Sequence, residues 1–138
     1  MTGNFTFSMI KPDVLQDGQV GQIITQIEDK YFEIKALKLT QLTLEHAEAF
    51  YAIHKKRPFY EQLCKYMASG PIIAMVLVKN NAVADFRTLL GATNPAEAAP
   101  ETIRKRFGKS IEANAIHGSD SDETAWTETQ LLFPGWSL

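Results

Sequence analysis

The sequence contains one cysteine, Cys64, in 138 residues. One thiol cannot form an intramolecular disulfide, and no Cys and His residues stand at the spacing of a zinc site. Basic residues are not in excess either, because the formal net charge is −2. The sequence therefore argues against a disulfide scaffold, a zinc finger and a general basic surface for nucleic acid or anionic membranes.

Long hydrophobic runs are also missing. No stretch reaches the roughly 18 apolar residues of a membrane span, and the first ten residues lack a basic leader. We therefore expect a cytoplasmic protein without membrane or nucleic-acid partners. The two common Gly-rich phosphate loops, Gly-x-x-x-x-Gly-Lys-Ser/Thr and Gly-x-Gly-x-x-Gly, do not occur, so side chains would have to hold any bound phosphate.

The composition is that of a globular protein. Hydrophobic residues make up 45% of the chain and charged residues 22%. This length suits one domain, residues 1–138, with one site.

Hydrophobic periodicity predicts an alternation of strands and helices. We expect strands over 5–9, 32–39, 72–78 and 114–117, the first half-buried and the third covered on both faces. The phase of the second strand flips at Leu37, as a bulge or burial on both faces would produce. We expect helices over 20–31, 44–51 with Thr43 as cap, 58–67, 83–90 with Gly91 as C-cap, 103–107, and from the turn after His117 to about Phe133.

This order predicts an α+β sandwich of the ferredoxin-like, split βαβ type. It has a four-stranded, mainly antiparallel sheet with helices packed on one face. The long irregular stretch over 92–113 indicates a functional loop.

The candidate phosphate-binding side chains are Lys11, Arg87 and Arg104. Guanidinium groups offer paired donors to phosphate oxygens, and Lys11 follows directly on the first strand. Each arginine also has a simpler interpretation as a solvated surface residue.

His117 is the candidate nucleophile, because it lies where a strand gives way to a Ser/Asp-rich helix start. A neutral imidazole attacks phosphorus without the activation that a hydroxyl needs. Its second nitrogen needs an orienting partner, for which Glu128, Ser119 and Asp120 are all candidates. The alternative is a structural role, in which His117 is only hydrogen-bonded at the start of the helix. We assign no role to His46 and His54.

Carboxylates and aromatic residues give weaker signals. Asp13, Asp120 and Asp122 do not form a dedicated metal cage, so we expect any Mg²⁺ to arrive bound to the phosphates of a ligand. Phe59 and Tyr66 lie on an apolar helix stripe, where core packing is the default interpretation.

Six motifs then stand in one order along nearly the whole chain: Lys11-Pro12-Asp13, Arg57-Pro58-Phe59, Met67 to Pro71, Gly91 to Pro95, Thr102-Ile103-Arg104, and Asn114 to Ser121. In this order and spacing the chain resembles the nucleoside diphosphate kinases. The last motif, Asn-Ala-Ile-His-Gly-Ser-Asp-Ser, is the most specific of them.

The resemblance implies a role for each matching residue. His117 would accept the γ-phosphoryl group, Glu128 would orient its ring, and Ser119 would support Glu128. Phosphate oxygens and neighbouring groups would be held by Lys11, Tyr51, Arg87, Thr93 and Arg104. Lys11 and Asn114 would reach the ribose 3′-hydroxyl, while Phe59 and Ile111 would lie on opposite sides of the base.

The resemblance also implies an enzyme with Mg²⁺ as cofactor. It would transfer phosphate from ATP or another nucleoside triphosphate to nucleoside diphosphates by a ping-pong mechanism, with broad base and sugar range. It would supply the NTPs and dNTPs other than ATP. Members of the family assemble as homotetramers or homohexamers.

Some positions depart from the family pattern. Val14 stands where Gly or Ala is common, and Tyr31 where a Gly commonly ends the first helix. Lys105 and Arg106 replace smaller and acidic residues, which predicts a more positive loop near the phosphates. Three alternatives stay open: a non-catalytic ferredoxin-like module that binds RNA, a histidine phosphocarrier without a nucleotide site, and a regulatory or scaffold role beside catalysis.

Overall fold

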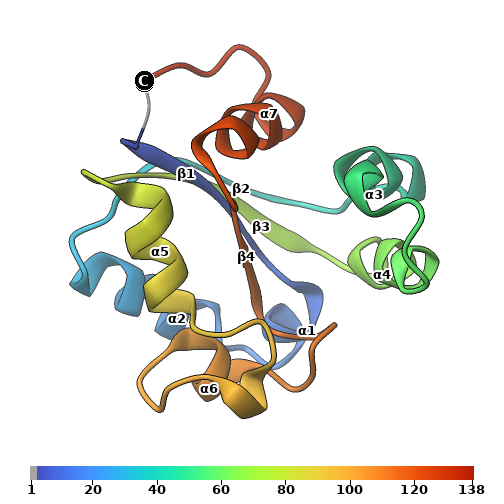
Figure 1. The fold of residues 1–138 in the computed structure, drawn as a ribbon, viewed down its shortest axis with the longest axis horizontal. Helices are drawn as coiled ribbons and strands as arrows, with labels where there is room; N and C mark the ends of the chain where they lie inside the picture. The colour runs from blue at the N-terminus through green and yellow to red at the C-terminus, as the bar shows by residue number, and fades with distance from the viewer. Residues whose placement is uncertain (1–2) are drawn as a thin grey trace.

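The computed structural model describes residues 3–138, and its centre is a four-stranded sheet with the order β2-β3-β1-β4 (Figure 1). The strands are β1 (Phe5–Ile10), β2 (Glu33–Thr40), β3 (Ile72–Val78) and β4 (Ile116–Gly118). All three neighbouring pairs are antiparallel. This confirms the predicted ferredoxin-like α+β fold, while Met1 and Thr2 lie outside the described residues.

Seven α-helices and two 3-10 turns connect the strands in the described part of the chain. They are α1 (Pro12–Gln16), α2 (Val20–Asp29), α3 (Leu44–Phe50), η1 (Ala52–His54), α4 (Tyr60–Met67), α5 (Ala82–Leu90), η2 (Pro95–Glu97), α6 (Ile103–Phe107) and α7 (Asp122–Leu132). Within residues 3–138, none of these helices has the length and apolar character needed to cross a membrane.

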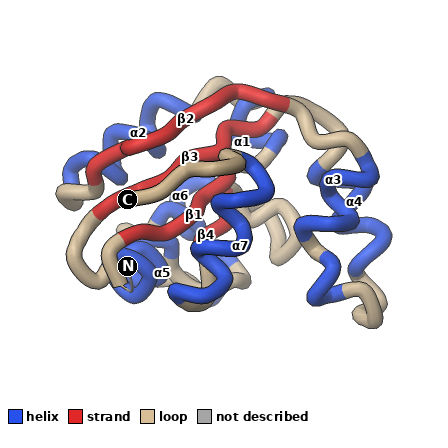
Figure 2. Tube along the Cα trace, turned by 90° about the horizontal axis from the view of Figure 1, so that it is seen from above, coloured by secondary structure: helices blue, strands red, loops and turns tan. Residues whose placement is uncertain are grey.

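The helices cover both faces of the sheet, so the expectation of a single covered face is wrong. Ile10, Met75 and Leu77 pack in one cluster with side chains of α2, α5 and α6. Phe7 and Met9 pack in a second cluster with side chains of α3, α4 and α7. β1 is therefore buried on both faces instead of half-buried, and Figure 2 shows α3 and α4 extending beyond one end of the sheet.

β2 is one of the two edge strands, and its change of phase is explained by a bulge. Its pairing with β3 shifts between Ile34 and Ala36, so that Lys35 is the extra residue. Leu37 and Leu39 then share one face and are 46% and 64% exposed. The bulge alternative is correct, whereas burial on both faces is not.

Several boundaries follow from local chemistry. The Thr43 hydroxyl caps α3, Gly91 ends α5 with a positive φ, and the bounds of β3 and α6 match the prediction. The first long helix ends before Tyr31, which has φ +68° and is exposed, the backbone conformation that glycine favours. The last strand begins two residues later than predicted because Ala115 has φ +78°, which breaks the extended backbone.

Candidate active site

A pocket of about 650 Å³ opens between β4, α5, α6, α7 and the α3–α4 pair. Ten of the eleven predicted site residues line it: Lys11, Tyr51, Phe59, Arg87, Thr93, Arg104, Ile111, Asn114, His117 and Glu128. The eleventh, Ser119, is fully buried and contacts the pocket through Glu128. Residues spread over more than a hundred positions thus meet in one place.

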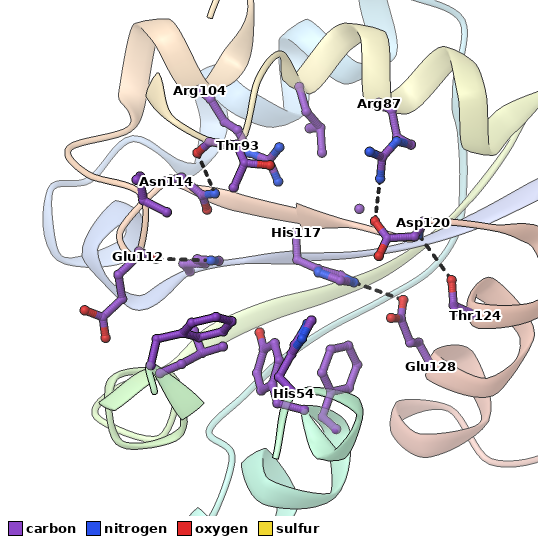
Figure 3. A pocket seen from close by; sticks show the side chains of 18 of the residues that line it. His54, Arg87, Thr93, Arg104, Glu112, Asn114, His117, Asp120, Thr124 and Glu128 are labelled. Carbon is purple, nitrogen blue, oxygen red and sulfur yellow. Dashed lines mark hydrogen bonds and ion pairs between the residues drawn. The ribbon is translucent and has the colours of Figure 1, made fainter. Parts of the chain in front are cut away.

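His117 is fixed by one carboxylate and one aromatic side chain. Its Nε2 lies 2.9 Å from Oε1 of Glu128, and its ring packs against the edge of Phe50 at a centroid distance of 5.3 Å. This contact occupies Nε2, so the ring nitrogen that remains for a ligand is Nδ1. Figure 3 shows the His117 ring in the pocket with Glu128 on one side and Arg104 and Thr93 across from it.

Glu128 is held in turn by a buried hydroxyl. The Ser119 hydroxyl donates to Oε1 of Glu128 at 2.8 Å and accepts from the backbone N–H of Phe7 at 3.1 Å. Because Phe7 belongs to β1, a buried inner strand of the sheet, the orientation of the carboxylate is tied to the core. Asp120, the third candidate partner of the imidazole, does not take this place, since its carboxylate contacts Arg87.

The helix that carries Glu128 has a well-defined start. Ser121 and Thr124 form a reciprocal capping box, and Asp122 and Glu123 place negative charge in the first turn, where the helix dipole favours it. Ala125 and Leu132 are buried against the sheet. Glu128 lies three residues after Ala125 and therefore on the same side of the helix, which turns it toward His117.

Lys11 is a buried cation of the pocket, and Arg104 is a partly buried one. Lys11 donates from Nζ to the carbonyl oxygen of Glu112 at 3.2 Å, and burial followed by the charge of Arg104 lowers the pKa of Lys11 to about 8. Arg104 donates to the carbonyls of Gly91 and Ile116 at 3.1 and 3.0 Å. Burial and the charge of Arg87 lower the pKa of Arg104 to about 10. In both residues burial is the larger cause of the lowered pKa, and a neighbouring positive charge is the second.

Arg87 stands at the open edge of the pocket and forms an ion pair with Asp120. Both side chains are more than half exposed. The Asp120 backbone N–H donates to the Thr124 hydroxyl at 3.2 Å, which connects the ion pair to the start of α7. Sequence reasoning did not find this pairing, because 33 residues separate the partners.

Two apolar side chains are exposed at the pocket mouth. Phe59 is 48% exposed and Ile111 is 59% exposed, and both line the pocket. Phe59 also packs on His54, which lies near Tyr51. The interpretation of Phe59 as a core residue is therefore wrong, and His54, to which we assigned no role, belongs to the pocket lining.

Unpaired polar atoms gather among the residues of the pocket. Within residues 3–138, eight buried side-chain polar atoms lack a hydrogen-bond partner, and four of them belong to pocket residues: Tyr51 Oη, Arg104 Nε, Glu112 Oε1 and Asn114 Oδ1. Buried polar groups are rarely left unpaired in native proteins, so this concentration indicates a polar ligand. Burial raises the pKa of Tyr51 far above its ordinary value, with the charge of Glu128 as a second cause, so its hydroxyl is a donor at neutral pH.

Asn114 is oriented by the loop that precedes it. Its side-chain amide donates to the carbonyl oxygen of Thr93 at 3.0 Å, which links the loop after α5 to the start of β4. Glu112 was not among the predicted site residues, although its carbonyl holds Lys11 and its side chain lines the pocket. No sequence signal marks Glu112, because its contact with Lys11 uses a backbone atom that every residue has.

Lys105 and Arg106 do not line the pocket, and Arg106 hydrogen-bonds to Gln26 of α2. The helix α6 turns Arg104 inward, so the two residues that follow it point elsewhere. Neither side chain is therefore placed to contact a phosphate in the pocket, and the more positive loop stays a prediction.

Within residues 3–138, no group of three or more His, Cys, Asp or Glu side chains is placed to hold a metal ion. Asp13 bonds to Tyr66, and Asp120 pairs with Arg87. These two carboxylates are thus engaged with protein partners, and the arrival of Mg²⁺ on ligand phosphates stays a prediction.

The chain matches known proteins over nearly its whole length. Residues 4–137 match the family model described as nucleoside diphosphate kinase. The chain is 54% identical over 98% of its length to a nucleoside diphosphate kinase of Flavobacterium psychrophilum, 97% of which is covered. It is 51% identical to that of Trichlorobacter lovleyi, with 96% of each chain covered. A crystal structure of the Aquifex aeolicus nucleoside diphosphate kinase superposes with a TM-score of 0.93 at 40% identity, with 95% of each chain covered.

Proposed function

This chain belongs to the nucleoside diphosphate kinase family, and we propose that His117 carries the phosphoryl group in the reaction of that family. The chain is an enzyme that transfers the γ-phosphoryl group of a nucleoside triphosphate to a nucleoside diphosphate. The observation that carries the proposal is the His117–Glu128 contact of 2.9 Å inside a pocket that also holds Lys11 and Arg104.

The transfer follows from this geometry in two balanced steps. The lone pair of His117 Nδ1 forms a bond to the γ-phosphorus, the bond from phosphorus to the bridging oxygen breaks, and its electron pair leaves with the nucleoside diphosphate. The positive charge that develops on the imidazole is stabilised by Glu128 at Nε2. A terminal phosphate oxygen of a second diphosphate then attacks the same phosphorus, the nitrogen–phosphorus bond breaks, and His117 becomes neutral again.

The surrounding cations stabilise the charge of the transferred group. Phosphoryl transfer depends mainly on positioning and on positive charge around the equatorial oxygens. Lys11 and Arg104 are anchored and therefore need little reorganisation, whereas Arg87 exchanges its Asp120 partner for a phosphate oxygen. The Thr93 and Tyr51 hydroxyls supply further donors. Mg²⁺ bound to the phosphates would neutralise part of their charge.

The nucleoside is held by stacking and by one polar contact. Phe59 and Ile111 offer flat or apolar surface to a base, which is compatible with every base and supports a broad substrate range. The unpaired Oδ1 of Asn114 is an acceptor for the ribose 3′-hydroxyl, with Lys11 as the donor on the other side. Ser119 acts through Glu128.

Two alternatives lose support. A phosphocarrier without a nucleotide site has no use for Arg87, Thr93, Arg104 and Asn114 around the histidine, yet all four line the same pocket. An RNA-binding module of this fold needs an open sheet face with aromatic side chains, and helices cover both faces of this sheet.

We also place the enzyme in the cytoplasm, as one domain that associates with further copies of itself into a homotetramer or homohexamer. The exposed Leu37 and Leu39 on edge strand β2 support self-association, because two adjacent exposed leucines form an apolar surface. Sedimentation velocity of the native protein distinguishes the two assemblies.

The decisive test is incubation with γ-labelled ATP and Mg²⁺, followed by GDP. We expect an acid-labile, alkali-stable label on the native protein that GDP discharges as labelled GTP. His117→Ala should take up no label. His46→Ala is the matched control, because His46 lies on exposed α3 outside the pocket and should label normally. An unlabelled native protein or a labelled His117→Ala variant would contradict the proposal.

A further inference from the structure

A partly buried hydrogen bond outside the pocket joins α4 to α1, the helix that begins directly after Lys11. The Tyr66 hydroxyl at the end of α4 donates to Oδ1 of Asp13 in the first turn of α1. Asp13 is only 8% exposed, and its Oδ2 has no partner within residues 3–138. Tyr66 is thus the one side chain that donates to this carboxylate in the described part of the chain, and neither residue lines the pocket.

The same region contains a second tie between α4 and α1. Gly70, which follows α4, lies so close to α1 that a Cβ atom built on it would be 3.6 Å from Cβ of Pro12. The hydrogen bond and this close packing hold the end of α4 against the start of α1. The carboxylate of Asp13 therefore has a fixed place two residues from Lys11.

Several charged groups act on Lys11. The Arg104 guanidinium of α6 lowers the Lys11 pKa, and the carboxylates of Asp13 and Glu112 raise it. Asp13 also acts on Lys109, whose ion pair with Asp17 of the segment after α1 measures 2.7 Å. Burial and Arg104 prevail, so the pKa of Lys11 lies at about 8, close to working pH. At this value a modest loss of negative charge nearby would remove much of the Lys11 ammonium.

We propose that Tyr66 and Asp13 are positioning residues of the phosphoryl-transfer site, which hold a carboxylate near Lys11 so that the Lys11 side chain keeps its ammonium charge. The consequence for catalysis rests on the proposed function, while the effect on Lys11 itself does not. Without the Tyr66 hydroxyl the Asp13 carboxylate has no hydrogen-bond donor within residues 3–138, so its place near Lys11 is no longer fixed. A displaced carboxylate attracts the Lys11 ammonium less and opposes the repulsion from Arg104 less.

The direct test is the pKa of Lys11 in the intact, nucleotide-free protein. Lysine labelled with ¹³C at Cε is titrated by NMR, and the Lys11 signal is identified by its disappearance in Lys11→Arg. We expect Asp13→Asn to lower the pKa of Lys11 by roughly one unit, the size expected for the loss of a nearby opposite charge. Tyr66→Phe should lower it in the same direction by a smaller amount.

Tyr60→Phe is the matched control. It removes a hydroxyl from the same helix, but this hydroxyl donates to the carbonyl oxygen of Glu48 at 3.1 Å, away from Lys11. Tyr60→Phe should leave the Lys11 pKa at its native value. If Tyr66→Phe does not fold, the Asp13→Asn titration decides alone. A Lys11 pKa equal to the native value in Asp13→Asn overturns the inference.

A kinetic measurement then separates this inference from the proposed function. The alkaline limb of the kcat/KM profile should move to lower pH in Asp13→Asn and Tyr66→Phe, and a purely structural loss would lower the whole profile without moving it. An active native enzyme with unmoved profiles in both variants contradicts only the positioning role. A native protein without transferase activity contradicts the proposed function, and the NMR titration still decides about Lys11.

Discussion

Replacing Glu128 by Gln tests the centre of the site, because it keeps the size of the side chain and removes its charge. In the native protein Oε1 accepts from both His117 and Ser119, at 2.9 and 2.8 Å. A hydrogen bond to a charged group contributes about 1.5–3 kcal/mol. Glu128 stabilises the imidazole by this amount when the ring becomes positive in the transition state, and not when the ring is neutral. Loss of the Glu128 charge should therefore lower the phosphorylation rate by roughly 10- to 150-fold.

The assay is rapid-quench phosphorylation of the enzyme by γ-labelled ATP over a range of ATP concentrations. The maximal rate should fall, whereas the ATP concentration at half-maximal rate should change little, because Glu128 acts on the ring and not on the nucleotide. Glu123→Gln on the exposed face of the same helix is the control and should match the native rate. A native rate in Glu128→Gln, with the fold intact, would refute this account of the site.

Three further predictions concern binding, pH and stability. The kcat/KM of the native enzyme should fall as pH rises through about 8. The pKa of Lys11 is lowered to about 8, so its ammonium is present below that pH and lost above it. A kcat/KM profile that is flat to pH 10 would contradict this. Phe59→Ala should raise the KM for the nucleotide by roughly 5- to 150-fold, because one stacking contact with the base is lost. Steady-state assays should show a similar increase in KM for ADP, GDP and CDP, since stacking does not depend on which base is bound. Gly91→Ala should lower the free energy of unfolding in urea by about 1–3 kcal/mol, because Gly91 has φ +87° and an added Cβ would lie 2.5 Å from Oγ1 of Thr102; an unchanged urea midpoint would exclude this strain.

The parts of the fold that could be predicted are those with a strong local signal. The continuous apolar run of β3, the Thr43 cap and the Gly91 end of α5 all depend on residues close in sequence, and all three predictions are confirmed. The cover on the second sheet face could not be predicted. Thr6 and Ser8 made β1 look half-exposed, yet both side chains are fully buried, because small hydroxyl residues fit beneath a packed helix.

The site divides in a similar way. Residue chemistry alone named Lys11, Arg87, Arg104 and His117 as candidates but left a surface role open for each arginine, and the family motifs supplied the other pocket residues. The contacts that complete the site were not predictable, because they join distant segments through groups without a motif. Examples are the Arg87–Asp120 ion pair and the carbonyl of Glu112 that holds Lys11. The left-handed conformation of Ala115 is another, since alanine does not normally favour it.

The positive charges of Lys11 and Arg104 are costly in the free protein and become favourable when a triphosphate binds. Burial is the larger cause of both lowered pKa values, followed by repulsion from Arg104 on Lys11 and from Arg87 on Arg104, so the free protein holds these positive charges at a cost. A triphosphate placed among the three cations would add an attraction that opposes both causes. The attraction is strongest in the transition state, where the negative charge on the oxygens of the transferred phosphoryl group is largest. The cluster of cations that costs stability in the free protein therefore favours the transfer.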